Sequence, residues 1–202
     1  MLYWLTLLSD GGDVFNLFRY ITFRAGGAFL TALLFGFVFG KPLINVLRKR
    51  QGKGQPIRED GPEGHFTKAG TPTMGGLLIV GALLTSTLLW ARLDNPFVWM
   101  VLFVTMSFAL IGFADDYAKV KKQNTAGVSG KVRLLLGFLI AAVAGYWAAQ
   151  YHPEQLTNQL AFPVFKDTLL NLGYVFVPFA VIVIVGAANA VNMTDGLDGL
   201  AI

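Results

Sequence analysis

Long uncharged stretches of hydrophobic residues recur five times along the chain. They cover Ala25–Gly40 (lengthened by Tyr20–Phe23), Ala69–Ala91, Asn95–Ala114, Leu134–Tyr151 and Thr168–Thr194. A helix that crosses a bilayer needs about 17–25 largely apolar residues, and four of the five stretches reach that length unaided. The pattern predicts an all-α integral membrane protein. We expect a polytopic bundle of five transmembrane helices, with residues 1–202 forming a single membrane domain.

The composition supports this class and excludes others. Hydrophobic residues make up 54% of the chain, and only 14% of its residues are charged. An ordinary soluble domain carries about 25% charged residues, and a small one could not bury so much apolar surface. Because the chain contains no cysteine, disulfides, thiolate metal sites and cysteine nucleophiles are excluded.

Basic residues gather in two segments between the hydrophobic stretches. The segment Lys41–Thr73 holds seven and Asp115–Arg133 holds five, so that 12 of the 16 Lys and Arg lie there. Lysine and arginine are enriched in cytoplasmic loops. The asymmetry therefore predicts two cytoplasmic loops, at about residues 47–73 and 115–133, with the N-terminus outside. The net charge of +4 then needs no nucleic-acid partner.

The first candidate for chemistry is the pair Asp115-Asp116, at the predicted inner end of the third hydrophobic stretch. Adjacent carboxylates repel each other unless a cation compensates them. Magnesium commonly binds through one or two carboxylates together with substrate phosphates. An acidic pair at a helix C-terminus also opposes the helix dipole, which favours a functional over a structural reason for it.

The second candidate follows the last hydrophobic stretch. Asn189, Asn192 and Asp195 lie about 60° apart on a helix and form one polar stripe. A break at Gly196 or Gly199 would turn Asp198 toward the same side. Hydrogen bonding between helices explains the asparagines but not the two aspartates.

The third candidate is a glycine-rich segment, Gly61–Gly76, that contains Lys68 and Thr73. It is not a Walker motif, because Gly76-Leu77 stands where Lys-Ser/Thr is required. A threonine hydroxyl beside a helix N-terminus is suited to contact phosphate. For the lysine alone, a solvated loop position is equally consistent.

The predicted topology brings all three candidates to the cytoplasmic side. Carboxylates, amides and a glycine-rich turn beside Lys119 and Lys131 suit metal-assisted phosphoryl transfer, and the apolar helices can hold a lipid tail. We therefore expect an enzyme that joins a cytoplasmic nucleotide substrate to a membrane lipid.

Three motifs resemble those of the phospho-N-acetylmuramoyl-pentapeptide-transferase family. They are Lys68-Ala-Gly-Thr-Pro-Thr-Met-Gly-Gly76, Asp115-Asp-Tyr117 and Asn189-Ala-Val-Asn-Met-Thr-Asp-Gly-Leu-Asp-Gly199. The wider family of polyprenyl-phosphate sugar-phosphate transferases shares the last two but usually not the first. The resemblance implies a bacterial inner-membrane enzyme of about ten helices that makes lipid I and UMP, the first membrane step of peptidoglycan synthesis. It implies Mg²⁺, UDP-N-acetylmuramoyl-pentapeptide and undecaprenyl phosphate.

The resemblance also implies roles for individual residues. Asp115 and Asp116 would be catalytic or close to the metal. Phosphates would face Lys119 and Lys131, and Thr73 would line the pocket. The remaining substrate-binding positions would be Lys68, Asn189, Asn192, Asp195, Gly196, Leu197 and Asp198, most of them around the uridine.

One departure from the family limits this reading. The family's third acidic residue, its main metal ligand, and its histidine-rich loop belong to a second half that this chain does not contain. The chain is expected to be an N-terminal fragment that is inactive alone. A transferase using UDP-N-acetylglucosamine and a non-catalytic lipid-binding membrane subunit are the alternatives. The residues leave open which aspartate does what, whether the transfer has one step or two, and the oligomeric state, a homodimer included.

Overall fold

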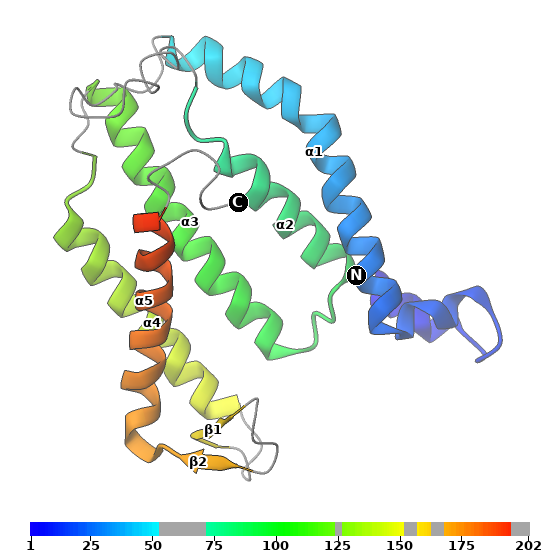
Figure 1. The fold of residues 1–202 in the computed structure, drawn as a ribbon. Coiled ribbons are helices and arrows are strands. Elements are labelled where there is room, and N and C mark those ends of the chain that lie inside the picture. The colour runs from blue at the N-terminus through cyan, green and yellow to red at the C-terminus, as the bar shows by residue number, and fades with distance from the viewer. Residues whose placement is uncertain (53–71, 124–126, 152–156, 163–167, 195–202) are drawn as a thin grey trace. The chain divides into compact units, whose positions relative to one another are not determined.

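The computed structural model describes residues 1–52, 72–123, 127–151, 157–162 and 168–194. The chain divides into two compact units, Met1–Ser129 and Gly130–Ile202, which are taken here one at a time. The first unit contains two short 3₁₀ helices, η1 (Leu2–Leu8) and η2 (Val14–Arg19), followed by three α-helices (Figure 1). These are α1 (Ile21–Gln51), α2 (Gly76–Trp90) and α3 (Pro96–Lys122).

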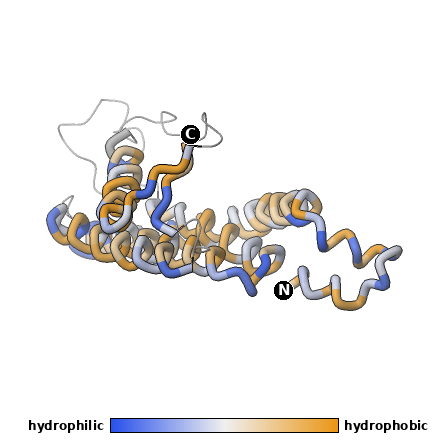
Figure 2. The backbone as a smooth tube through the Cα atoms, turned by 90° about the horizontal axis from the view of Figure 1, so that it is seen from below, coloured by the Kyte–Doolittle hydropathy of each residue, from blue (hydrophilic) through white to orange (hydrophobic). Residues whose placement is uncertain are grey.

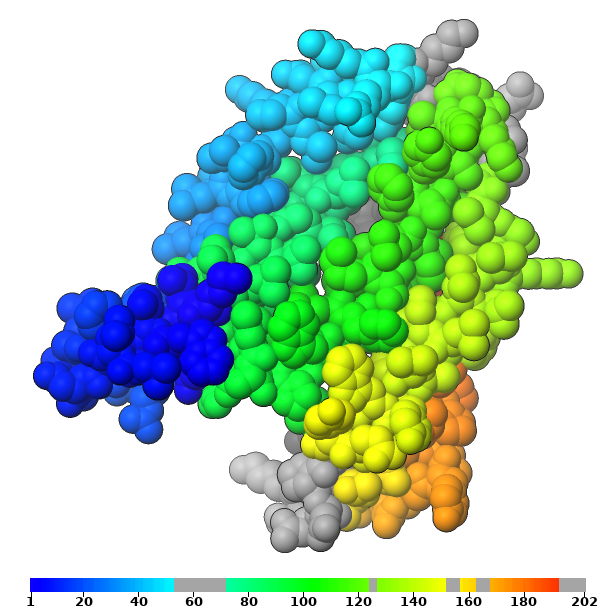
Figure 3. Space-filling model, turned by 180° about the vertical axis from the view of Figure 1, so that it is seen from behind, coloured from blue at the N-terminus to red at the C-terminus, as the bar shows by residue number. Residues whose placement is uncertain are grey.

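Helices α1 and α2 make the main contact of the first unit, and an aromatic cluster lies at one end of α2. The Trp90 ring lies over Gly27, so closely that a Cβ atom at Gly27 would collide with it. Its indole N–H donates to Thr31 Oγ1 at 2.9 Å, and the ring stacks on Phe18 at 5.9 Å between centroids. Figure 3 shows the N-terminal residues (dark blue) as a lobe of the first unit beside these helices. Glycine at position 27 thus permits the close packing.

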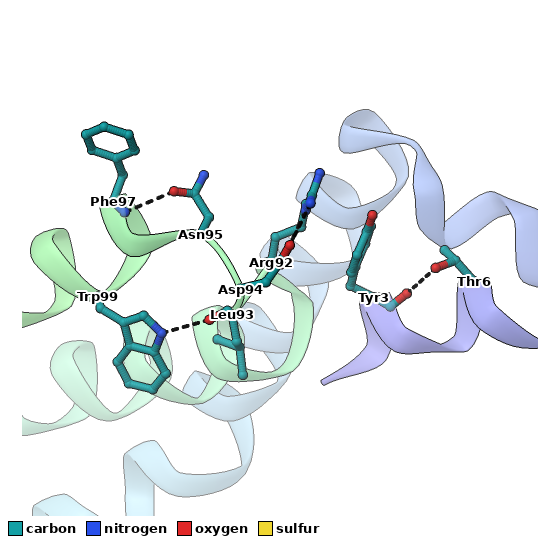
Figure 4. A network of polar contacts seen from close by, with 8 residues as sticks. All are labelled: Tyr3, Thr6, Arg92, Leu93, Asp94, Asn95, Phe97 and Trp99. Carbon is teal, nitrogen blue, oxygen red and sulfur yellow. Dashed lines mark hydrogen bonds and ion pairs between the residues drawn. The ribbon is translucent and has the colours of Figure 1, made fainter. Parts of the chain in front are cut away.

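The turn between α2 and α3 is ordered by polar contacts (Figure 4). Asn95 caps α3 by accepting from the Phe97 N–H at 2.9 Å, with proline at the next position, as helix starts favour. Arg92 pairs with Asp94 at 2.6 Å and lies over the Tyr3 ring, 4.7 Å from its centroid. Hydrogen bonding from the Arg92 guanidinium holds the pKa of the Asp94 carboxyl below its ordinary value. The turn is thereby linked to η1.

The second unit consists of α4 (Gly130–Tyr151), a β-hairpin, the 3₁₀ turn η5 (Gly173–Val175) and α5 (Phe176–Thr194). Strands β1 (Gln159–Ala161) and β2 (Leu169–Asn171) pair antiparallel, with Leu160 opposite Leu170. Helix α4 packs on α5 at Gly145, where an added Cβ would lie 3.3 Å from Ala180 Cβ. Small residues let the two helix backbones approach closely.

The helical membrane class is confirmed, but the five spanning helices are not. Four helical segments in the described residues are long and apolar enough to cross a bilayer: α1, α3, α4 and Gly173–Asn192. Figure 2 shows hydrophobic residues (orange) recurring along the coiled segments of the backbone. The stretch predicted at Ala69–Ala91 forms a helix of only 15 residues, α2, preceded by non-helical residues from Pro72. Its positive-φ residue Met74 lies outside right-handed helical geometry.

Other predicted boundaries also move. Helices α1 and α3 continue to Gln51 and Lys122, into the segments predicted as loops from about 47 and 115. Both end in a basic turn, and cations there interact favourably with the helix dipole, so these charges extend the helices. In the second unit, α5 begins at Phe176 and not at Thr168, because β2 and the positive-φ residue Gly173 precede it.

Candidate functional site

The acidic pair lies within α3 and not at its end as predicted. Helix α3 runs on through Lys122, so Asp115 and Asp116 stand almost two turns before its C-terminus. The physical reason is Lys119, which is four residues after one carboxylate and three after the other. On a helix it lies about 40° and 60° from them, between the two. The acidic pair is thus paired with a cation of its own helix, as such spacings favour.

Asp115 is the more enclosed of the two carboxylates, with only 6% of its surface exposed. Its Oδ2 atom lies 2.6 Å from Lys119 Nζ, and its Oδ1 atom accepts the Val128 N–H at 2.8 Å. Gly127, at φ +56°, packs so closely that a Cβ atom there would collide with Asp115 Oδ1. Both oxygens of this carboxylate therefore serve contacts within the first unit.

Asp116 is more accessible and differently held. Its side chain is 32% exposed, against 8% for that of Asp115. Its Oδ2 accepts from Thr73 Oγ1 at 3.1 Å, and its Oδ1 lies 3.9 Å from Lys119 Nζ. Of the carboxylate oxygens in the pair, Asp116 Oδ1 has the longest ion-pair distance. Asp116 is thus less closely paired with Lys119 than Asp115 is.

Thr73 is positioned by a residue that the sequence did not point to. The Gln51 side chain, at the end of α1, accepts from the Thr73 N–H at 2.9 Å and donates to the Thr73 carbonyl at 3.0 Å. In the sequence, Gln51 follows the basic run Arg48–Arg50, a position typical of a solvent-exposed helix end. The one available signal was spacing, because Gln51 lies one turn after Leu47 and both are buried.

The structure brings together four of the predicted site residues, Thr73, Asp115, Asp116 and Lys119. Lys131 is exposed in the first turn of α4 and belongs to the second unit. In α5, the Asn189 side chain donates to the Val185 carbonyl of its own helix at 2.8 Å, and Asn192 is exposed. The other predictions lie outside the described residues: Lys68, Asp195, Gly196, Leu197 and Asp198.

The donor set of the first unit fits a cation that is also bound by substrate. Among the residues that the structure describes, no group of three or more His, Cys, Asp or Glu side chains could hold a metal alone. Asp115 and Asp116 present two carboxyl groups, and Lys119 lies beside both of them. A phosphate that approached this cluster would need further positive charge, and Mg²⁺ commonly supplies it between carboxylate and phosphate oxygens.

Comparisons with known proteins identify two matching segments of the chain. Residues 98–202 match the model of glycosyl transferase family 4, and residues 68–80 match phospho-N-acetylmuramoyl-pentapeptide-transferase signature 1. The hydrogen bond from Thr73 to Asp116 joins the signature segment to the family segment.

Curated relatives match the whole chain. Phospho-N-acetylmuramoyl-pentapeptide-transferases of Ruegeria sp. (strain TM1040) and Ruegeria pomeroyi are 84% and 81% identical over 202 residues. That of Dinoroseobacter shibae is 72% identical over 203. The chain spans about half of the length of each relative, 56%. Because the family model covers more than half of the chain, the chain belongs to glycosyl transferase family 4.

Proposed function

We propose that the complete protein transfers phospho-N-acetylmuramoyl-pentapeptide from its UDP-linked form to undecaprenyl phosphate in the bacterial inner membrane. The products are lipid I and UMP. The observation that carries this proposal is the contact between Thr73 and the Asp115-Asp116 pair, which unites the transferase signature with the acidic motif. The signature favours this substrate over UDP-N-acetylglucosamine.

A protein catalyses phosphoryl transfer mainly by positioning the reacting groups and compensating the charges of the phosphates. The lipid phosphate must approach as a nucleophile while bearing negative charge, beside two carboxylates. Lys119 supplies one positive charge between them, 2.6 Å from Asp115 and 3.9 Å from Asp116. Bound Mg²⁺ would neutralise the transferring diphosphate, and Asp115 and Asp116 are the residues of this chain that would hold it.

Asp116 is suited to take a proton from the lipid phosphate. Its side chain is 32% exposed, and the Thr73 hydroxyl donates to its Oδ2 at 3.1 Å. Removal of such a proton by a positioned carboxylate contributes about 10²–10⁴-fold to rate. Lys68 and the segment Asp195–Asp198 would bind the nucleotide, and Lys131 a phosphate.

The test measures UMP release by the full-length protein with undecaprenyl phosphate and Mg²⁺. Asp115→Asn and Asp116→Asn each remove one charge while nearly keeping shape, so kcat should fall by at least about 10²-fold. Asp198→Asn should mainly raise KM for the UDP-linked substrate, since that contact is made equally in the ground and transition states.

Asp94→Asn is the matched control, because this exposed aspartate is in the turn between α2 and α3. It should leave kcat unchanged. Near-normal kcat in both variants of the acidic pair would remove these residues from the mechanism. Failure of the wild-type protein to release UMP would reject the proposed function itself.

A further inference from the structure

The buried side-chain amide of Gln51, at the end of α1, forms hydrogen bonds with the backbone of Thr73, the residue that contacts the acidic pair. Gln51 is only 8% exposed, although it ends a helix whose preceding turn is charged. Its amide oxygen and nitrogen bond both backbone groups of Thr73, at 2.9 and 3.0 Å. A side-chain amide that pairs with one residue's N–H and C=O fixes the position of that residue as a strand partner would. We call this pair of hydrogen bonds the Gln51 clasp.

The residue after the clasp is strained. Met74 has φ +73°, which is uncommon for a residue with a side chain. Such conformations persist only when the surrounding structure imposes them, and they gather at functional sites. Two constraints hold Met74 here. The clasp fixes Thr73 before it, and the Leu77 N–H bonds the Met74 carbonyl at 3.1 Å, opening α2.

The Gln51 clasp fixes the direction in which the Thr73 side chain points. With the backbone of Thr73 fixed on both sides, its hydroxyl donates to Asp116 Oδ2 at 3.1 Å. Gln51 itself is bonded to the Thr73 backbone and reaches the acidic pair through Thr73. In the part of the chain that the structure describes, the hydrogen bonds from Gln51 lead to the carboxylate through the Thr73 hydroxyl.

We infer that Gln51 is a positioning residue for the proposed phosphoryl transfer. By holding Thr73, it fixes the orientation of the Asp116 carboxylate and keeps Oδ1 turned away from the threonine, free to face the reacting phosphate. The inference rests on the proposed function for the reaction that it serves. If Gln51 had only a structural role, it would hold the residues before α2 against the end of α1, and its replacement would not change the rate of transfer.

A double-mutant cycle in the full-length protein separates these roles. Gln51→Leu removes the clasp, Thr73→Val removes the hydroxyl, and the combined variant removes both. We expect kcat for UMP release to fall about 10-fold in each single variant, because small misplacements of reacting groups carry such costs. If both act through one hydroxyl, the combined variant should be no slower than the slower single variant. Thr73→Ser, which keeps the hydroxyl, should restore most of kcat.

The matched control is Gln123→Leu. Gln123 is also a glutamine at the C-terminal end of a helix, but it is exposed and its amide donates to the nearby Val120 carbonyl, at 2.8 Å. This variant should keep kcat. Both glutamine variants should melt within a few degrees of the wild type, which separates a lost clasp from a lost fold. KM for both substrates should change less than about 3-fold in Gln51→Leu.

Amide hydrogen exchange tests the clasp without any activity. In the wild type, the Thr73 N–H should exchange slowly because Gln51 Oε1 accepts it. In Gln51→Leu, exchange of the Thr73 amide should rise at least about 10-fold, and Gln123→Leu should leave it unchanged. Equal exchange in Gln51→Leu and wild type would overturn the inference. So would an active wild type with undiminished kcat in Gln51→Leu, or kcat losses that multiply in the combined variant. An inactive wild type would instead refute the proposed function.

Discussion

Gly127 is the residue whose packing constrains the acidic pair most directly. It combines a positive φ of 56° with a position where a Cβ would collide with Asp115 Oδ1. Gly127→Ala should therefore force the carboxylate away from Lys119 and strain the backbone, at a cost of about 1–3 kcal/mol. We expect a lower melting temperature and at least about 10-fold slower UMP release from the full-length protein.

Gly130→Ala provides the comparison for this variant. Gly130 is three residues further on, has no positive φ, and an added Cβ there would meet open space. It should leave both measurements near those of the wild type. Equal effects of the two alanines would show that Asp115 does not depend on the Gly127 contact.

The sequence predicted those residues of this cluster whose side chains carry a charge or a hydroxyl group. Asp115, Asp116, Lys119 and Thr73 carry charges or a hydroxyl, and they lie in contact with one another. Gln51, Gly127 and Val128 escaped prediction, because the first acts on a distant backbone and the others through their own backbone. Contacts of this kind depend on the fold and leave no pattern in the sequence.

At the scale of elements, glycine at position 27 lets α1 and α2 approach closely at Trp90. Gly27→Ala would push a methyl group into the Trp90 ring, and overpacking of this kind costs about 1–3 kcal/mol. Gly26, the neighbouring residue, has open space around its Cβ position, so Gly26→Ala should be neutral or stabilising, since alanine favours helices over glycine by about 0.5–1 kcal/mol. Thermal unfolding in detergent should show a lower melting temperature for Gly27→Ala and an equal or higher one for Gly26→Ala. A parallel response would contradict the packing described for Trp90.

Hydrophobic stretches predicted the five α-helices but not where they begin and end. Helix α3 passes through a basic turn that looked like loop, because Lys119 pairs with carboxylates one turn earlier. Helices α2 and α5 start later than predicted, after Met74 and Gly173 with their positive φ. Apolar composition reports burial in lipid or protein, whereas helix ends are decided by individual backbone angles and hydrogen bonds.

For the whole molecule, the distribution of basic residues predicts an orientation that labelling can test. The chain has no cysteine, so single-cysteine variants carry one label. Asp10→Cys, before η2, should react with a membrane-impermeant reagent from outside intact cells. Gln123→Cys, after α3, should react only once the cytoplasmic side is opened. Both positions are exposed. Labelling of both from one side would reject the predicted topology and the cytoplasmic location of the acidic pair.

The shortness of α2 bears on the lipid around it. A helix of 15 residues is about 22 Å long at about 1.5 Å per residue, whereas the hydrocarbon core is about 30 Å thick. The predicted topology requires α2 to cross, and a helix that is too short is accommodated by local thinning of the bilayer. The headgroup layer would then dip toward Thr73, just before α2, and toward its partner Asp116.

Thicker bilayers should oppose this thinning. The full-length protein should accordingly show a higher KM for undecaprenyl phosphate in vesicles of 22-carbon than of 14-carbon phosphatidylcholines, and a KM independent of chain length would argue against it. Hydrophobic mismatch at α2 would then bring the headgroup layer close to the carboxylates. A lipid phosphate could meet them there while its tail stays in the membrane.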